Sequence, residues 1–594
     1  MSYRRKKLLA LFCATALSMT AVAGCTGTKS STGNVVSSET ETNAEETSAQ
    51  SEAGTFSSAD MFTERDLAGT YEESGAVYVT LSDDGITGET DGVVINGQMV
   101  TITAEGTYIF SGTLSEGQIV VDADNAKVQI VFDNVDITCA SSAAVYVKSA
   151  EKVFVTLAEG SQNTLRNTDE YVAIDDNNID AVIFAKSDLT LNGTGSLTII
   201  SAEGHGIVSK DDLKIIGGTY DITAAGHALS GKDSVRIADG TFILTAEKDG
   251  IHAENADDEE KGYIYIADGD FTITSDGDGM DASNIVQIED GTLDITAGGG
   301  SANSLKTHES DVPGGPGGGM PQNGEKLDGE SMPQMGEKPD GENMPQDTTT
   351  DESGTSTKGI KAGGGMYLNG GTYQIDSADD SIHSNANITI ADGTYTLATG
   401  DDGVHADDAL IVNGGTITVT ESYEGLEGLA VTINDGTIDI TASDDGINTA
   451  GEKMELNGGY IHILAGGDGV DSNGDLTING GEIYIDGPSD NGNSAIDYGD
   501  RSSAYVNGGM LVAIGSSGMA EGMSDSSKQE VLMVKLGEQM EAGDVELTDN
   551  EGNVIVSYTA LKSYDCVIIS TAEVESGATY TLTTSGTTTE VTAE

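Results

Sequence analysis

The sequence predicts an all-β chain that folds as a right-handed parallel β-helix of about 22 residues per coil, followed by a small C-terminal β module. Three observations predict this fold: a glycine turn that recurs at a fixed period, apolar residues that alternate with polar ones on both sides of that turn, and the lack of any helical period. The 594 residues are also too many for one ordinary globular core, so several domains or a linear repeat array is expected.

A GGT or DGT turn, or a close variant of it, marks each repeat. Apart from steps that insertions lengthen, its second residue recurs every 21 to 23 positions. The aligned glycines are Gly218, Gly240, Gly269, Gly291, Gly371, Gly393, Gly415, Gly436, Gly459, Gly481 and Gly509.

Apolar residues occupy fixed places around each of these glycines. They lie five and three residues before it, as do Leu410 and Val412, and two and four residues after it, as do Ile417 and Val419. This alternation is typical of strands with one buried face. A third, shorter apolar step lies about eleven residues before the glycine, as at Val404. Each repeat therefore holds three short strands.

Three short strands in each repeat leave few architectures. A propeller blade needs roughly 40 residues or more, and a leucine-rich repeat has its own Leu/Asn signature. In a parallel β-helix each repeat is one coil, and the inward side chains stack from coil to coil about 4.8 Å apart.

The N-terminus has the pattern of a lipoprotein signal peptide, residues 1–24. A basic stretch precedes an apolar run from Leu8 to Ala23, which is too short to span a membrane and ends in Val22-Ala23-Gly24-Cys25. We expect Cys25 to be lipidated and to hold the protein at a membrane, with its body outside the cell; an ordinary secretory cleavage site is the alternative.

The rest of the chain divides by composition. Residues 25–62 are rich in Ser, Thr and Glu and are expected to form a flexible tether, and residues 63–200 an N-terminal cap with the first coils. Residues 201–528 are the regular β-helix, interrupted by a Gly/Pro/Met insertion at 308–357 that cannot bury a core and is expected to be disordered. Residues 529–594, where the glycine turns stop, form the C-terminal β module.

The charge balance excludes one class of partner. The chain has 99 acidic and 27 basic residues, a net charge of −72, so it repels nucleic acid and attracts cations. Beyond the signal peptide and Cys25 only Cys139 and Cys566 remain, which we expect to be buried thiols rather than a disulfide framework. The chain is expected to act as a monomer.

Acidic residues recur in register beside the short apolar step. An Asp-Gly or Glu-Gly pair precedes that step and a polar residue follows it, so both positions form columns at the surface of the coil. Aspartate can simply cap backbone N–H groups in such turns. Like charges on neighbouring strands repel, however, and a divalent ion relieves that repulsion. Turn carboxylates are the ligands that Ca²⁺ prefers, which predicts Ca²⁺ as the cofactor. The candidate ligands are Asp249, Asp278, Asp281, Asp401, Asp402, Asp444, Asp445, Asp468 and Asp471.

Ligand-binding candidates lie in and beside the same columns. His383 and His405 follow the short strand on adjacent coils, Glu427 follows them, and Tyr423 lies next to the acidic column; these four are the candidate carbohydrate contacts. Other outward tyrosines, such as Tyr265, are weaker candidates. No GxSxG, HExxH, CxxC or phosphate-loop pattern occurs, which argues against hydrolases of those types.

Three segments resemble a family of bacterial carbohydrate-binding domain-containing lipoproteins: GDDGVHADDALIVNGGTITVT, SDDGINTAGEKMELNGGYIHIL and GGDGVDSNGDLTINGGEIYID. The similarity extends over about residues 77–525. It implies a parallel β-helix like that of polysaccharide lyases, bound calcium, and adhesion to cellulose and acidic pectic polysaccharides.

The resemblance leaves three functional classes. We favour a non-enzymatic, cell-surface carbohydrate-binding lipoprotein in which Ca²⁺ bridges protein carboxylates to uronates. The second is a calcium-dependent pectate lyase acting by β-elimination, with Lys306 or Lys361, in the outward slot of His383 and His405, as the base. The third is a structural adhesin without a sugar site, since the fold alone does not imply chemistry.

Overall fold

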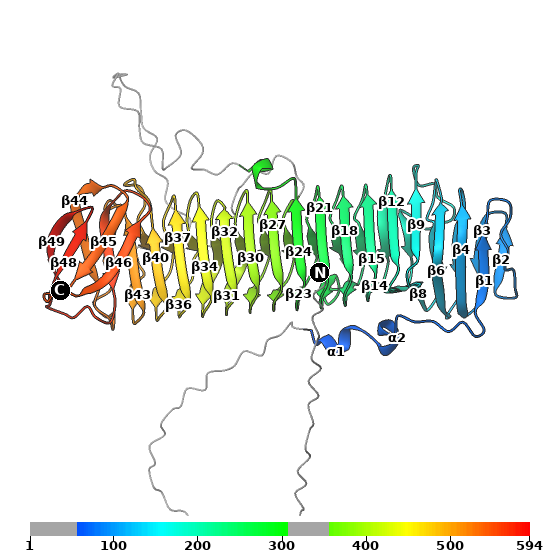
Figure 1. The fold of residues 1–594 in the computed structure, drawn as a ribbon, viewed down its shortest axis with the longest axis horizontal. Coiled ribbons are helices and arrows are strands. Elements are labelled where there is room, and N and C mark those ends of the chain that lie inside the picture. The colour runs from blue at the N-terminus through cyan, green and yellow to red at the C-terminus, as the bar shows by residue number, and fades with distance from the viewer. Residues whose placement is uncertain (1–55, 307–355, 500, 594) are drawn as a thin grey trace, which may run out of the picture. The chain divides into compact units, whose positions relative to one another are not determined.

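The computed structural model describes residues 56–306, 356–499 and 501–593. The signal peptide, Cys25, most of the tether and nearly all of the 308–357 insertion lie outside these residues, so the expectations for them remain predictions. In the described part, each coil contributes one strand to each of three parallel ladders, which confirms the predicted parallel β-helix. Figure 1 shows the strands of one ladder, from β12 to β40, side by side in chain order.

The first ladder consists of the short strands that open each coil. They are β5 (Gln118–Asp122), β7 (Val145–Ser149), β10 (Ala181–Ala185), β13 (His205–Ser209), β16 (Leu229–Gly231), β19 (Ile251–Ala253), β22 (Met280–Ala282), β25 (Ile360–Ala362), β28 (Ile382–Ser384), β31 (Val404–Val412), β33 (Leu426–Ile433), β35 (Ile447–Thr449), β38 (Val470–Ser472) and β41 (Ile496–Tyr498).

The second ladder follows it in each coil, and β31 and β33 run through into it. Its other strands are β4 (Gly106–Leu114), β6 (Lys127–Thr138), β8 (Lys152–Leu157), β11 (Asp188–Gly193), β14 (Asp212–Ile215), β17 (Ser234–Ile237), β20 (Tyr263–Ile266), β23 (Val286–Ile288), β26 (Met366–Leu368), β29 (Ile388–Ile390), β36 (Met454–Leu456), β39 (Leu476–Ile478) and β42 (Ala504–Val506).

The third ladder has the longest regular strands and comes after the glycine turn. They are β9 (Gln162–Asn167), β12 (Ser196–Ser201), β15 (Thr219–Ala224), β18 (Thr241–Ala246), β21 (Asp270–Ser275), β24 (Thr292–Ala297), β27 (Thr372–Ser377), β30 (Thr394–Thr399), β32 (Thr416–Glu421), β34 (Thr437–Ala442), β37 (Tyr460–Ala465), β40 (Glu482–Asp486) and β43 (Met510–Gly515). A short 3-10 helix, η1 (Ser301–Asn303), follows β24.

One hydrophobic core runs through the described coils, from Val79 to Ile568. Its side chains are the ones that the alternation predicted: Leu410 and Val412 are 0% exposed and Ile417 is 1% exposed. Because the strands pair in register, each inward residue contacts its equivalent in the next coil. Cys139 and Cys566 are buried and unpaired, as expected.

The Asn-Gly-Gly turn has two structural roles. Gly415 has φ +91°, and a side chain there would lie 2.8 Å from the carbonyl oxygen of Gly393 in the preceding coil, so only glycine fits. The preceding asparagine joins coils through its amide: the Asn434 side chain donates to that of Asn413 at 2.8 Å, and Asn457 donates to Asn434 at 2.9 Å. Further donations from Asn479 and Asn507 continue this stack.

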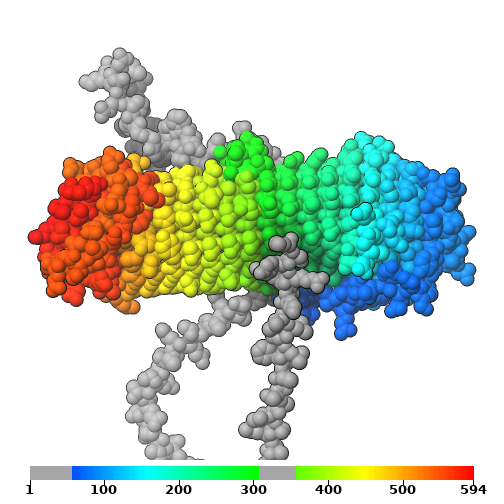
Figure 2. Space-filling model, viewed as in Figure 1, coloured from blue at the N-terminus to red at the C-terminus, as the bar shows by residue number. Residues whose placement is uncertain are grey.

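The N-terminal segment packs against the coils, so the ordered chain begins before residue 62, the expected end of the tether. It contains α1 (Ser58–Met61) and α2 (Glu64–Leu67), and Figure 2 shows it in blue beneath the coils. Met61 and Phe62 cover Tyr265, which is 0% exposed. The expectation that Tyr265 is open to a ligand is therefore wrong, because a segment distant in sequence covers it.

Both ends of the β-helix are closed by antiparallel pairs. At the N-terminal end β2 (Val93–Asn96) forms an antiparallel hairpin with β3 (Met99–Ile102), while β1 (Val77–Leu81) pairs in parallel with β4. At the other end β47 (Tyr564–Ser570) pairs antiparallel with β43 and with β44 (Leu532–Met540). A second antiparallel sheet contains β45 (Gly543–Thr548), β46 (Val554–Ala560), β48 (Thr579–Thr584) and β49 (Thr587–Thr592). The C-terminal strands thus cover the open edge of the last coil.

None of the helices in the described ranges has the length and apolar character needed to cross a membrane.

The aromatic stack inside the third ladder generates a stability prediction. The ring of Phe242 lies parallel to those of Tyr220 and Phe271, with centroids 5.3 and 4.7 Å away. Replacing Phe242 by Ala leaves a cavity between two coils and should lower the free energy of unfolding by about 3–5 kcal/mol. Its neighbour Ile243 is 48% exposed, so Ile243→Ala should cost less than about 1 kcal/mol. Urea unfolding of both variants tests this; equal losses would contradict the assigned strand faces.

Candidate functional site

Two polar columns run along the first ladder. The strand column lies on the strands themselves, and the turn column lies three residues earlier in each coil. The strand column contains Ser230, His252, Asp281, Lys361, His383, His405, Glu427, Asn448, Asp471 and Asp497. The turn column contains His205, His227, Asp249, Asp278, Lys358, Asp380, Asp402, Glu424, Asp445, Asp468 and Ser494.

The turn column joins each coil to the next through a repeated hydrogen bond. Asp249 Oδ1 accepts the backbone N–H of Asp278 at 2.9 Å, and Asp445 Oδ1 accepts that of Asp468 at 2.6 Å. The same bond joins Asp278 to Lys358, Asp380 to Asp402, Asp402 to Glu424, and Asp468 to Ser494. This is the backbone-capping role of aspartate, and it leaves the Oδ2 atom of each carboxylate for another partner.

Several of these carboxylates are buried, although the sequence predicted that they lie at the surface. Asp278 is 1% exposed, Asp402 5%, Asp401 6% and Asp468 8%. The turns of adjacent coils cover each carboxylate, and the hydrogen bond to the next coil draws it inward. A buried carboxylate needs a counter-charge or a proton.

In the middle of the ladder that counter-charge comes from two lysines. We call Asp379, Asp380, Asp401, Lys306 and Lys358 the central cluster. Lys358 Nζ lies 2.8 Å from both Asp379 Oδ1 and Asp380 Oδ2, and Lys306 Nζ lies 2.6 Å from Asp379 Oδ1 and also pairs with Asp401. Ammonium groups therefore occupy the positions between these carboxylates.

The pKa values of Asp380 and Asp401, two carboxylates of the central cluster, are shifted in opposite directions. Burial acts to raise the pKa of Asp380, but Lys358, His383 and Lys306 hold it below the usual range of aspartate. Burial and the nearby Asp402 raise the pKa of Asp401 to about 9, although Lys306 opposes that rise. Asp380 is thus ionised near neutral pH, whereas ionisation of Asp401 is disfavoured.

Elsewhere on the first ladder, histidines and one lysine lie against the buried carboxylates. Asp249 Oδ2 lies 3.0 Å from Nδ1 of His227 and of His252, and these contacts hold the pKa of Asp249 below its usual value despite burial. Lys361 Nζ lies 3.5 Å from Asp278 Oδ2 and 3.3 Å from Asp281 Oδ1. Burial still raises the pKa of Asp278 to about 6.

The C-terminal part of the ladder has carboxylates without such partners. We call Asp444, Asp445, Asp468 and Asp471 the C-terminal acid cluster. One oxygen from each of Asp445, Asp468 and Asp471 lies within 4.8 Å of the others. In the part of the chain that the structure describes, no lysine, arginine or histidine forms an ion pair with any of the four.

Burial and mutual repulsion raise the pKa values of Asp445, Asp468 and Asp471. The pKa rises to about 8 for Asp445, about 7 for Asp468 and about 6 for Asp471, in each case with burial as the first cause and neighbouring aspartates adding to it. Near neutral pH Asp445 therefore largely retains its proton, and a divalent ion would take the place of that proton.

The four candidate carbohydrate contacts fall together beside the central cluster. His383, His405 and Glu427 are neighbours on β28, β31 and β33, and Tyr423 is half-buried in the turn before β33. The histidines are already engaged: His383 Nδ1 lies 2.8 Å from Asp380 Oδ2, and His405 Nδ1 lies 2.9 Å from Glu427 Oε2. Their Nε2 atoms also have partners: His383 Nε2 lies 2.9 Å from Asn385 Oδ1, and His405 Nε2 lies 3.5 Å from Asp407 Oδ1. The two side chains are 13% and 21% exposed.

The two lysines proposed as a lyase base do not share one position. Lys361 pairs in register with His383 and lies in the strand column as predicted. Lys306 follows η1 and lies outside the first ladder, so the prediction that it occupies the same position as His383 and His405 is wrong. The next strand of the ladder after β22 is β25. Neighbouring aspartates raise the pKa of both lysines although burial opposes this, so neither is a free amine near neutral pH.

Sequence reasoning missed several members of the columns. Asp380 precedes Ser381 rather than glycine, so the Asp-Gly pattern passed over it. His205 and His227 stand where most coils carry an acid, and their Nδ1 atoms accept the next coil's N–H at 2.8 and 3.2 Å. Aligning every coil on its short strand, whatever residue precedes it, would have found all three.

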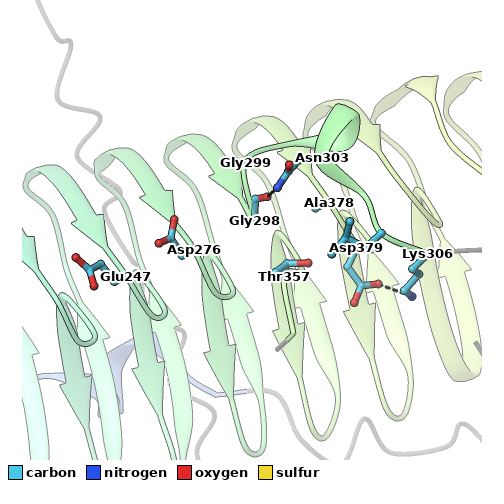
Figure 3. Close-up of a pocket in the computed structure, with 10 residues that line it drawn as sticks. Glu247, Asp276, Gly298, Gly299, Asn303, Lys306, Thr357, Ala378 and Asp379 are labelled. Atoms are coloured by element: carbon cyan, nitrogen blue, oxygen red, sulfur yellow. Dashed lines mark hydrogen bonds and ion pairs between the residues drawn. The ribbon is translucent and has the colours of Figure 1, made fainter. Parts of the chain in front are cut away.

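A cavity of about 410 Å³ lies beside the central cluster, at the turns that follow the third ladder. Figure 3 shows Glu247 and Asp276 on successive coils at one side of it and the Lys306–Asp379 ion pair at the other. The charged residues in its lining are acidic apart from Lys306.

Comparisons with known proteins found a matching family, a related protein and a similar solved structure. The family described as "Carbohydrate-binding domain-containing protein" matches residues 96–403 and 401–591. A protein of that name from Acetivibrio thermocellus is 41% identical over 135 residues, which are 22% of this chain and 47% of that protein, so the match spans about half the length of that relative. A solved structure titled "polysaccharide lyase-like protein from C. thermocellum, Gadolinium derivative" has 36% sequence identity and a TM-score of 0.37, and the match covers 38% of this chain and 92% of that one.

The raised pKa values of the C-terminal acid cluster predict a pH dependence. Between about pH 4 and pH 8 the folded cluster retains protons that the unfolded chain has released, so stability falls as pH rises through this window. The pKa values of Asp249 and Asp380 are lowered, so these two residues change the stability with pH only below about pH 4.

Asp445→Asn combined with Asp468→Asn removes two of these ionisations while keeping the Oδ1 acceptors. In a chelating buffer, we expect the Tm of the unaltered chain to fall more between about pH 5 and pH 8 than that of the double variant. Differential scanning calorimetry measures both, and the same fall in both proteins would show that the cluster is not the source.

Proposed function

The chain belongs to the carbohydrate-binding domain-containing protein family, and from this membership and the C-terminal acid cluster we propose that it binds plant-type polysaccharides, cellulose or acidic pectic chains, with the help of Ca²⁺. The observation that carries the calcium part of the proposal is the set of three carboxylates, from Asp445, Asp468 and Asp471, that lie within 4.8 Å without an ion-pair partner among the described residues.

The contrast between the two clusters supports a cation at the C-terminal one. In the central cluster the ammonium groups of Lys306 and Lys358 already lie between the carboxylates. In the C-terminal acid cluster, Asp445 Oδ1 and Asp468 Oδ1 are used by backbone N–H groups, and their Oδ2 atoms remain for an ion. Hard carboxylate oxygens favour Ca²⁺ over a transition metal.

A bound Ca²⁺ would also explain how so acidic a chain holds an acidic ligand. With a net charge of −72 the protein repels a polyuronate, whereas an ion coordinated by Asp468 and Asp471 has positions left for ligand carboxylates and hydroxyls. His383, His405, Tyr423 and Glu427, a few coils away on the same ladder, are the proposed contacts to the sugar chain.

The proposed location is the cell surface. Lipidation of Cys25 would anchor the chain to a membrane, and the residues between Cys25 and the first described segment would separate the β-helix from it.

Binding is favoured over the lyase alternative by the charge state of the candidate bases. β-Elimination needs an amine without its proton to remove the proton next to the uronate carboxylate. Burial acts to lower the pKa of Lys361, but Asp278 and Asp281 raise it above its usual value, and Lys306 is held in the central cluster. Neither lysine is therefore suited to act as the base.

Retention on insoluble polysaccharide tests the proposal. The full chain should be retained on cellulose or polygalacturonate in Ca²⁺ and released from polygalacturonate by a chelator. The Asp445→Asn/Asp468→Asn variant should bind Ca²⁺ at least about tenfold more weakly and lose the calcium-dependent part of retention. Asp221→Asn, at an exposed position of β15, is the matched control and should behave as the unaltered chain.

Two results would contradict the proposal and favour another function. An unsaturated product in the supernatant would make the protein a lyase. Absence of retention on every polysaccharide, with or without Ca²⁺, would favour the structural adhesin.

A further inference from the structure

A basic pocket lies in the N-terminal half of the first ladder, in a chain that is otherwise strongly acidic. It has a volume of about 220 Å³ and is lined by three histidines and three lysines: His205, His227, His252, Lys210, Lys232 and Lys248. Glu254 is the one carboxylate in its lining. With 27 lysines and arginines in 594 residues, three lysines around one small pocket stand out from the rest of the chain.

Lysines recur in register beside this pocket. Val147, Ala185, Ser209 and Gly231 pair in succession on β7, β10, β13 and β16. The residue that follows each of them is a lysine: Lys148, Lys186, Lys210 and Lys232. Four lysines thus lie at the same position of four consecutive coils, where like charges repel. Asp122 compensates Lys148 at 2.7 Å, and an anion along the others would relieve their repulsion.

The lysines of the pocket have little internal compensation. Lys232 Nζ pairs with Asp257 at 2.8 Å, but the Asp257 side chain is 80% exposed, which makes this a weak, solvent-screened pair. Lys210 Nζ lies over the Phe184 ring at 5.4 Å from its centroid. Among the described residues Lys248 forms no ion pair, and its charge helps to hold the pKa of His205 at about 3, after burial and the neighbouring His227.

The histidines add hydrogen-bond donors to the pocket. His205 Nδ1 accepts the backbone N–H of His227 at 2.8 Å, and His227 Nδ1 accepts that of Asp249 at 3.2 Å. Asp249 Oδ2 also lies 3.0 Å from His227 Nδ1, whereas among the described residues His205 Nδ1 has only the backbone N–H of His227 as its partner. A neutral ring bonded in this way carries its proton on Nε2. No described residue accepts a hydrogen bond from Nε2 of His205 or His227.

A transition metal fits these histidines less well. The rings of His227 and His252 are stacked, with centroids 4.1 Å apart and planes 11° from parallel, so their in-plane lone pairs run side by side instead of converging on one ion. The Nδ1 of His227 is also occupied by the Asp249 amide. Ammonium and N–H donors around an open pocket are instead suited to an anion.

We propose that this pocket binds an anionic group of a polysaccharide directly, without a metal: the carboxylate of a uronate or a sulfate ester. The inference rests on the proposed carbohydrate-binding function and adds a second, cation-independent site to the same ladder. Lys210 and Lys232 supply the charge and the Nε2 atoms of His205 and His227 donate to the anion or to sugar hydroxyls. A single acidic chain along the first ladder would then meet lysines at one end and Ca²⁺ at the other.

The test is binding of soluble oligosaccharides to the full chain in a chelating buffer, measured by calorimetry. The probes are trigalacturonate, a sulfated oligosaccharide of similar length and neutral cellotriose. Lys210→Gln combined with Lys232→Gln keeps both side chains long and polar, and should weaken binding of the preferred anion by about fivefold to tenfold. Lys453→Gln, at an exposed lysine that pairs with Glu455 on the second ladder, should leave binding unchanged.

The outcomes separate this inference from the proposed function. Weaker binding of trigalacturonate alone identifies a uronate site, and weaker binding of the sulfated probe alone identifies a sulfate site. Equal affinity in the double variant and the unaltered chain, or no binding of either anion in chelator, overturns the inference. If the inference fails but the unaltered chain is still retained on polygalacturonate in Ca²⁺, the proposed function stands. If the unaltered chain is retained on no polysaccharide, the inference and the proposed function both fail.

Discussion

The structure depends on one repeated hydrogen bond, in which a turn side chain of one coil accepts the backbone N–H of the equivalent residue in the next coil. Asp249, Asp380 and Asp445 make it through Oδ1, and His205 makes it through Nδ1. The bond keeps neighbouring coils in register and places acids above one another at the strand spacing. It therefore creates a buried column of like charge that the rest of the molecule must compensate.

Three kinds of compensation follow one another along the first ladder. Histidines pair with Asp249 at the N-terminal end, and lysines, chiefly Lys358, pair with the central carboxylates. At Asp445 and Asp468 no side chain of the described chain supplies the positive charge, and the pKa values rise instead. One column can thus serve as a structural element in its centre and as a cation site where the compensation is missing. In the same way, the surplus of lysine near the histidines favours an anion.

The repeat and the buried strand faces were predictable from the sequence because they depend on local alternation, as the burial of Leu410 shows. The charge compensation was not, because it depends on side chains from different coils. Lys306 reaches Asp379 from the other side of a long insertion, and Ser381 hid Asp380 from a search for Asp-Gly pairs. The burial of Asp402 was also unforeseen, since neighbouring coils and not its own sequence cover it.

The most direct test of this account is a crystal structure of the full chain grown with Ca²⁺, together with one grown with Mn²⁺ to locate ions by anomalous scattering. The account predicts an ion among Asp445, Asp468 and Asp471, and none among Asp379, Asp380 and Asp401, where Lys306 and Lys358 lie between the carboxylates. An ion in the central cluster with its lysines displaced, and none at the C-terminal acid cluster, would contradict it.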